Sequence, residues 1–322
     1  MTELMEKILS RENMMQAYKK VKAKNGASGV DGIGTEEIRE YLIENWEEIR
    51  EKIKKRKYKP QPVLRVEIPK PSGGTRNLGI PSVVDRIIEQ AIVQVITPIV
   101  EPYFSEYSYG FRPKRSAQQA VLKLLEYFNE GYLYVVDIDL EKFFDNVPQD
   151  KLMTLVGKII QDPDTESLIA KYLKAGVMVK GRYEESTKGT PQGGNLSPLL
   201  SNIMLNELDK ELGARNLHFV RYADDCVIVV KSSAAASRVM HTVTNWIERK
   251  LGLKVNASKT KVTKPRYLKY LGFGFVKMGD KWQARPHADS LAKFKRTLKR
   301  LTSRSWGISM DERIQRLNWV IR

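Results

Sequence analysis

The pattern of apolar and polar positions changes its period several times along the chain. Apolar residues recur every three or four positions over residues 2–24, 35–55 and 84–99, which predicts three helices. Between the second and the third, residues 63–68 and 76–80 alternate around a Pro-Ser-Gly-Gly run, which predicts a β-hairpin. The first third of the chain is therefore expected to be helical with one inserted hairpin.

From residue 116 onward, helical and strand patterns are mixed. Strand candidates come as adjacent pairs rather than separated by single crossover helices, so the predicted fold class is α+β with an antiparallel sheet packed on helices. Ser197, which Pro198 follows, is expected to be the N-cap of a helix. The elements expected here are a helix at 116–129, a strand at 133–140, helices within 149–174, a short hairpin around 180–182, a helix from 197, strands at 217–222 and 225–231, a helix at 234–251, a hairpin at 268–285 and a helix at 311–322.

The composition adds a strong positive charge to this pattern. Of the 322 residues, 42% are hydrophobic, enough for a buried core in two or three domains of roughly 150 residues each. Against 38 Asp plus Glu stand 55 Lys plus Arg, a net charge of +17. Residues 254–322 alone hold 18 basic and four acidic side chains, a net charge of +14. Such an excess indicates a polyanionic partner, which is a nucleic acid or, less often, an anionic membrane surface.

Cysteine content and the N-terminus indicate the compartment. The single Cys226 excludes a disulfide framework and a cysteine-rich zinc site, and three scattered histidines do not supply a histidine-built one. The N-terminal residues mix charges with apolar side chains, unlike a signal peptide. No stretch reaches the roughly 18 consecutive apolar residues of a membrane helix. We therefore expect a cytoplasmic protein without a membrane partner.

Carboxylates occur at the ends of apolar strands. Asp224 and Asp225 separate two apolar strands, and Asp137 and Asp139 share one face of an earlier strand. An acidic hairpin turn is one interpretation. The other is a metal site, because neighbouring like charges repel unless a cation neutralises them. Oxygen ligands select Mg²⁺, with Mn²⁺ as a substitute, and three carboxylates can hold two such ions for phosphoryl transfer. The residues alone thus predict a Mg²⁺-dependent enzyme acting on nucleic acid.

Several short motifs surround the acidic turn in a fixed order. They are Ile68-Pro69-Lys70-Pro71 with Arg76, Ser108–Pro113, Gly189–Pro198, Tyr222-Ala223-Asp224-Asp225 and Tyr270–Phe273. With this ordered set, which runs from about residue 60 to 275, the chain resembles the reverse transcriptases encoded by group II introns, the maturase class. Reverse transcriptases of the retron or diversity-generating kind resemble it less, and a Mg²⁺ nuclease would not explain Lys70, Arg76 and Gln192.

The resemblance implies roles for the acidic residues and their neighbours. Asp139, Asp224 and Asp225 would be the catalytic, metal-binding triad, with the backbone carbonyl of Leu140 as a further ligand. Strand parity leaves Asp137 and Asp139 equivalent, and the family's spacing to Phe144 selects Asp139. Phe144 would pack under the incoming sugar and exclude a 2′-OH, whereas a core aromatic is the alternative interpretation.

The resemblance also implies contacts to the nucleotide and to nucleic acid. Lys70 and Arg76 would grip the triphosphate, Gln192 would touch the nucleotide, and Lys259 would give a proton to pyrophosphate. For the cations, solvated surface side chains are the alternative. The residues expected to bind nucleic acid are Lys52, Lys54, Lys55, Arg56, Lys57, Lys59, Arg112, Tyr270, Gly272, Lys295 and Arg296. For the run from Lys52 to Lys59, a solvated helix face is the competing interpretation.

The implied architecture is a right-hand polymerase. Residues 1–115 would form an N-terminal extension and fingers, 116–285 a palm with an interleaved fingers segment near 150–190, and 286–322 the start of a truncated thumb. The expected function is RNA-directed DNA polymerisation with two Mg²⁺ ions. The expected partners are group II intron RNA, an RNA template with a DNA primer, and dNTPs, and a homodimer is left open. The alternative is a fragment that acts chiefly as an intron-RNA-binding splicing cofactor without polymerase activity.

Overall fold

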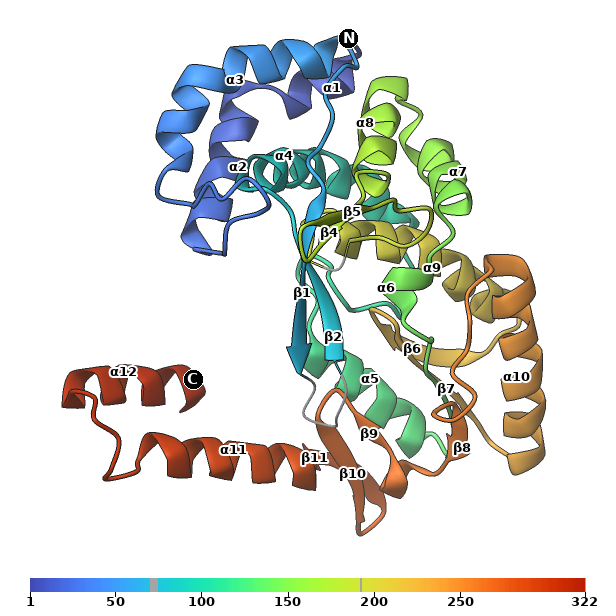
Figure 1. Cartoon of the computed structure of the whole chain (residues 1–322). Helices are drawn as coiled ribbons and strands as arrows, with labels where there is room; N and C mark the ends of the chain where they lie inside the picture. The colour runs from blue at the N-terminus through green and yellow to red at the C-terminus, as the bar shows by residue number, and fades with distance from the viewer. Residues whose placement is uncertain (70–74, 192, 322) are drawn as a thin grey trace.

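The described residues form three sheets that helices connect and cover (Figure 1). The structure is a computed structural model that describes residues 1–69, 75–191 and 193–321. The strands are β1 (Val63–Pro69), β2 (Thr75–Ile80), β3 (Tyr134–Ile138), β4 (Val177–Val179), β5 (Arg182–Glu184), β6 (His218–Tyr222), β7 (Asp225–Val230), β8 (Lys261–Thr263), β9 (Lys269–Tyr270), β10 (Phe273–Met278) and β11 (Lys281–Pro286). The helices are α1 (Glu3–Ile8), α2 (Arg11–Ala23), α3 (Ile38–Lys54), α4 (Val83–Val100), α5 (Ala117–Asn129), α6 (Phe143–Asn146), α7 (Gln149–Ile160), α8 (Pro163–Leu173), α9 (Ser197–Ala214), α10 (Ser233–Trp246), α11 (Ala288–Leu301) and α12 (Met310–Ile321), with short helical turns η1 (Glu101–Tyr103), η2 (Ile247–Leu251) and η3 (Pro265–Tyr267).

The central sheet has the strand order β6-β7-β3-β8, and all of its pairs are antiparallel. Alternate residues of a strand point to opposite faces. On β3, Val136 and Ile138 join the large core cluster that includes α9 and α10, whereas Val135 joins a second cluster with α5 and β10. Both faces are therefore covered, which confirms the predicted antiparallel sheet packed on helices.

A second sheet has the order β2-β1-β4-β5. The predicted hairpin is confirmed as β1 and β2, and β4 with β5 confirms the short hairpin at 180–182. However, β1 and β4 pair in parallel, with Val63 opposite Val177. The antiparallel pairing expected for the strands therefore does not extend to this pair. This parallel pair ties the hairpin to the segment that follows α8.

The N-terminal helices pack around α4, which is buried on most sides. Ser82 caps this helix, because its side chain accepts a hydrogen bond from the backbone N–H of Asp85. The single helix predicted over residues 2–24 is wrong. The chain breaks after α1, and Ser10 caps α2 by accepting from the backbone N–H of Asn13.

One further prediction about a helix was wrong, and one helix was not predicted at all. Ser197 is not an N-cap: Leu196 holds that position, and the Ser197 hydroxyl donates instead to the carbonyl oxygen of Pro191 at 2.7 Å. The helix α11 was not predicted, and it extends with α12 away from the rest of the molecule (Figure 1). Among the helices of the described part, none is both long and apolar enough to cross a membrane.

Candidate active site

The carboxylates lie at one end of the central sheet. The antiparallel register pairs Asp137 with Val227 and Ile138 with Cys226, so one further step places Asp139 opposite Asp225. Tyr222 pairs with Asp225, which leaves Ala223 and Asp224 as the two-residue turn between β6 and β7. The two strands expected on either side of this turn are confirmed as β6 and β7, and Cys226 of β7 is buried. Asp139, Asp224 and Asp225 therefore come from adjacent strand ends.

A buried arginine supports this turn from beneath. Ala223 has a left-handed backbone, with φ of 57°, and Arg221 Nη1 donates to its carbonyl oxygen at 2.8 Å. Arg221 also forms a two-pronged ion pair with Asp209 of α9, at 2.7 and 2.6 Å. Both side chains are fully buried. Burial alone would lower the pKa of Arg221, but the Asp209 carboxylate raises it above its ordinary value. The guanidinium thus remains charged and fixes the turn.

The motif at residues 108–113 packs against the same turn. A Cβ atom on Gly110 would lie 2.3 Å from the backbone nitrogen of Ala223, so only glycine fits there. Asn202 of α9 links the two parts, since its side chain donates to the Gly110 carbonyl at 2.9 Å and accepts from Arg221 at 3.1 Å. Sequence reasoning missed the roles of Arg221, Asn202 and Asp209. The sequence feature that could have indicated Arg221 is its position, a cation within the largely apolar strand β6.

Lys259 lies against Asp139. Its Nζ atom is 3.3 Å from Asp139 Oδ2. Desolvation and neighbouring carboxylates raise the pKa of Asp225 to about 6, while Lys259 opposes the rise. Those carboxylates are Asp224, Asp137 and Asp139. Burial likewise raises the pKa of Asp137. Negative charge is therefore concentrated at this strand end, and Lys259 and Lys261 balance part of it.

The donor set and the charge both suit a divalent cation. The candidate ligands are carboxylate oxygens, which Mg²⁺ and related ions prefer. Leu140 forms a bridge with Val255 whose hydrogen bonds use the carbonyls of Asp139 and Lys254, and not that of Leu140. Within the described ranges, however, no three His, Cys, Asp or Glu side chains are grouped closely enough to hold an ion. The carboxylates would have to close around a cation, and Lys259 would have to leave Asp139.

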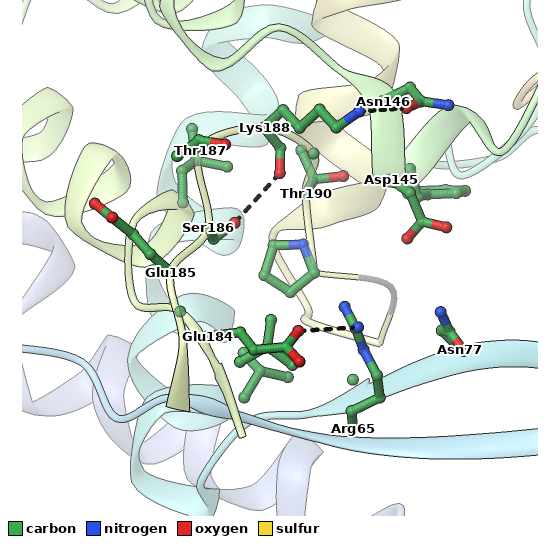
Figure 2. Close-up of a pocket in the computed structure, with 18 of the residues that line it drawn as sticks. Arg65, Asn77, Asp145, Asn146, Glu184, Glu185, Ser186, Thr187, Lys188 and Thr190 are labelled. Atoms are coloured by element: carbon green, nitrogen blue, oxygen red, sulfur yellow. Dashed lines mark hydrogen bonds and ion pairs between the residues drawn. The ribbon is translucent and has the colours of Figure 1, made fainter. Parts of the chain in front are cut away.

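A cavity lies between α6 and the β1–β2 hairpin (Figure 2). Phe144 is one of the residues that line it. The cavity has a volume of about 390 Å³. Arg65 and Asn77 enter it from the hairpin, and Asp145 and Thr190 lie across from them (Figure 2). The lining residues of the described chain include none of the three candidate catalytic aspartates. Phe144 is therefore on the wall of a cavity that these aspartates do not line.

Of the residues expected to contact the triphosphate and the base, only the backbone of Arg76 belongs to the described structure. Lys70 and Gln192 lie outside the described residues. Arg76 lies in β2, where its backbone pairs with Ile68. The hairpin that was expected to carry two of these cations is present, and its β2 strand contributes Asn77, Leu78 and Gly79 to the cavity wall.

The residues expected to bind nucleic acid fall into distinct groups. Arg112 is buried and donates to Glu101 and to the Ser108 carbonyl, both at 2.8 Å, so its side chain is not available to nucleic acid. Tyr270 is 3% exposed, and its side chain is likewise enclosed. These two expectations are wrong for the side chains, because motif membership does not report burial. Gly272 has φ of 83° and accepts from the His287 backbone, which joins β9 and β10 to α11.

The expected nucleic-acid-binding cations differ in whether an acidic side chain pairs with them. Lys57 and Lys59 are exposed, as are Lys295 and Arg296 on α11. The other four cations of the run from Lys52 to Lys59 have acidic partners. These pairs are Lys52–Glu48 at 2.6 Å, Lys54–Glu51 at 2.7 Å, Lys55–Glu51 at 3.7 Å and Arg56–Asp164 at 2.6 Å. The helix-face interpretation therefore accounts for much of this run.

Comparisons with known proteins agree with the site. The family model described as reverse transcriptase (RNA-dependent DNA polymerase) matches residues 68–275. Protein YkfC of Escherichia coli (strain K12) is 33% identical over 78% of this chain and 74% of its own length. The group II intron-encoded protein LtrA of Lactococcus lactis subsp. cremoris is 38% identical over 65% of this chain, which spans only 35% of LtrA.

A solved structure gives the fold independently of sequence. Apo telomerase from Candida tropicalis, truncated from its C-terminal domain, has a TM-score of 0.52 at 14% identity, covering 70% of this chain and 55% of that one. The matched family segment contains the end of β1, the whole of β2 and the acidic turn. The chain therefore belongs to the reverse transcriptase (RNA-dependent DNA polymerase) family, and its relatives place it with the group II intron reverse transcriptases and maturases.

Proposed function

We propose that this chain transfers a deoxynucleotide from a dNTP to the 3′-OH of a DNA primer, directed by an RNA template. The observation that carries the proposal is the meeting of Asp139 with the Asp224–Asp225 turn at one end of β3 and β7. These carboxylates, with the Leu140 carbonyl, would hold two Mg²⁺ ions, which Mn²⁺ can replace. Bound divalent cations would polarise phosphoryl oxygens and neutralise developing charge.

Other residues would bind and orient the nucleotide. Lys259, 3.3 Å from Asp139, is placed to lose that partner when a cation binds and to donate a proton to pyrophosphate. Phe144 would lie under the sugar, since it lines the cavity between α6 and the β1–β2 hairpin. By resemblance, Lys70, Arg76 and Gln192 would contact the triphosphate and the base, because guanidinium and ammonium groups suit phosphate oxygens.

The wider assignments follow the same proposal. Residues 1–115 would be the N-terminal extension and fingers, 116–285 the palm with its inserted segment near 150–190, and 286–322 the beginning of a thumb. Intron RNA is the proposed second partner, because a relative is a group II intron-encoded protein. A splicing role of the complete protein would then accompany polymerisation.

Primer extension on an RNA template tests the central proposal. Asp224→Asn should reduce the rate about 1,000-fold, since several kcal/mol of transition-state stabilisation depend on the metal ligands. Asp150→Asn, on the exposed start of α7, is the matched control and should remain active. Undiminished extension by the Asp224 variant would refute the assignment.

The sugar-gate role of Phe144 has its own test. Phe144→Ala should incorporate ribonucleotides that the parent rejects, because the space for a 2′-OH opens. The measurement is the ratio of kcat/KM for dNTP and rNTP. An unchanged ratio would leave Phe144 as a core aromatic.

A further inference from the structure

Two carboxylates are buried one helical turn apart in α4. Asp85 is 1% exposed and Glu89 is 3% exposed, on a helix whose other buried residues are almost all apolar. Burying an acid is costly unless polar partners compensate. The partners of each carboxylate therefore indicate why it is there.

Asp85 has local, structural partners. It accepts hydrogen bonds from the Tyr58 hydroxyl at 2.7 Å, from Ser82 Oγ at 2.8 Å and from the Gln61 backbone N–H at 3.0 Å. These contacts fasten the linker between α3 and β1 to the start of α4. None of the three comes from the segment that follows β5.

Glu89 instead binds the turn that precedes α9. Its Oε2 atom accepts from the backbone N–H of Asn195 at 2.6 Å and of Leu196 at 3.4 Å. The Asn195 side chain donates to the Arg86 carbonyl at 3.0 Å, one turn earlier on α4. The Asn195 contact, at 2.6 Å, is at the short end of the range for N–H···O hydrogen bonds. The end of the turn is therefore held from α4.

The beginning of the same turn is held from α6. The backbone N–H of Thr190 donates to the Phe144 carbonyl at 2.7 Å, and that of Gly189 donates to the Val147 carbonyl at 2.8 Å. Thr190 and Pro191 line the cavity next to Phe144. Hydrogen bonds therefore hold the turn at both ends: to the backbone of α6 at Phe144, and to the side chain of Glu89 on α4.

The middle of the turn leaves little space for movement. A Cβ on Gly193, whose φ is +128°, would lie 2.2 Å from the Gly79 carbonyl oxygen of β2. A Cβ on Gly194 would lie 3.0 Å from Glu89 Oε2. The turn is therefore packed between the β1–β2 hairpin on one side and Glu89 on the other.

We propose that Glu89 is a positioning residue for the nucleotide site, acting through the backbone of Asn195 and Leu196. It holds residues 193–196 against β2 and so sets the width of the cavity between that strand and Phe144. The inference rests on the proposed polymerase function for its kinetic consequence. Its structural part, that Glu89 orders this turn, stands independently of that function.

The kinetic test compares Glu89→Ala, Glu89→Gln and Asp85→Asn in primer extension. Glu89→Ala should raise KM for dNTP about tenfold to 100-fold, the effect of leaving two backbone N–H groups without their acceptor, with a smaller change in KM for template–primer. Glu89→Gln keeps an acceptor oxygen and should recover most of that loss. Asp85→Asn, buried on the same helix but not bonded to the turn, should leave KM for dNTP within about threefold of the parent.

The outcomes separate positioning from general stability. If all three variants lose activity in proportion to their loss of folded protein, with KM for dNTP unchanged, the proposal is overturned. Gly194→Ala covers the case in which Glu89→Ala does not fold, because the added methyl presses on Glu89 without emptying the core. It should also raise KM for dNTP, and an unchanged KM would count against the proposal.

Hydrogen exchange distinguishes this proposal from the proposed function itself. Amide protection at residues 189–196 should fall in Glu89→Ala and remain in Asp85→Asn, whether or not the chain polymerises DNA. If the parent shows no extension yet this difference is seen, the polymerase proposal fails and the role of Glu89 in ordering the turn survives. Equal protection in both variants overturns the role of Glu89.

Discussion

At the scale of single residues, Arg221 couples stability to the acidic turn. Arg221→Leu leaves Asp209 buried without its cation, which should cost about 3–5 kcal/mol of unfolding free energy. Arg221→Leu with Asp209→Leu removes both charges and should recover much of that stability. Activity should stay low in both, because the Ala223 carbonyl has lost its donor. Urea denaturation and primer extension measure the two effects, and recovery of activity in the double variant would contradict this prediction.

Gly110 offers a sharper steric test of the same turn. Gly110→Ala places a methyl 2.3 Å from the backbone nitrogen of Ala223, so Asp224 must shift or the motif must unpack. We expect at least a tenfold loss of kcat, about 1.4 kcal/mol, with a melting temperature only modestly lowered. Gly213→Ala near the end of α9 is the control, since a Cβ there meets nothing within 4 Å. A fully active Gly110 variant would show that the turn tolerates displacement.

The residues that sequence reasoning found and missed differ in kind. Asp224 and Asp225 were predictable, because two like charges between apolar strands are visible along the chain. Arg221 and Glu89 were not, since their partners come from α9 and from the turn before it, which only the tertiary structure brings close. Arg112 was misassigned for the converse reason. A motif identifies a residue without saying whether it faces solvent or Glu101.

At the scale of elements, the spacing of apolar residues located most helices and strands. It failed where a local cap or a distant strand decides where an element begins or with what it pairs. Ser10 divides one apolar stripe into α1 and α2 through a hydrogen bond that the period does not record. The parallel pairing of β1 with β4 joins segments more than 100 residues apart. α11 was missed because its many cations obscure the stripe formed by Leu291, Phe294 and Leu301.

The burial of α4 makes its stability depend on pH through Glu89. Burial, reinforced by Asp85, raises the pKa of Glu89 from its ordinary 4.5 to about 8. Between these values the folded protein keeps the proton that the unfolded chain has lost, so stability falls as pH rises. Glu89→Gln cannot lose this proton. The unfolding free energy of Glu89→Gln minus that of the parent should therefore rise with pH, by up to about 1.4 kcal/mol per pH unit from pH 5 to 8.

Denaturant titrations at several pH values measure the difference for Glu89→Gln. Glu36→Gln, at an exposed position, is the control and should give a nearly constant difference from the parent. A Glu89→Gln difference that does not vary with pH would mean that the carboxyl ionises in the folded protein as easily as in the unfolded chain.

At the scale of the whole molecule, negative side chains gather at the end of the central sheet, whereas most of the excess positive charge lies in the C-terminal segment, residues 254–322. The +14 of residues 254–322 contrasts with +3 for the rest of the chain, where the acidic site lies. In the run from Lys52 to Lys59, four of the six cations pair with Glu48, Glu51 or Asp164. Long-range attraction for a polyanion should therefore come mainly from α11 and its neighbours, which extend from the body (Figure 1).

This division predicts how salt weakens binding of a template–primer duplex. Lys295→Gln with Arg296→Gln should reduce the magnitude of the slope of log K against log salt by about 1 to 2, since each lost phosphate contact contributes roughly 0.7–0.9. The matched control removes two cations already paired with acids, Lys7→Gln with Lys210→Gln. Because it changes net charge equally, it separates local contacts from total charge. Equal slopes for the two double variants would show that only the overall charge matters, and that α11 does not contact the duplex.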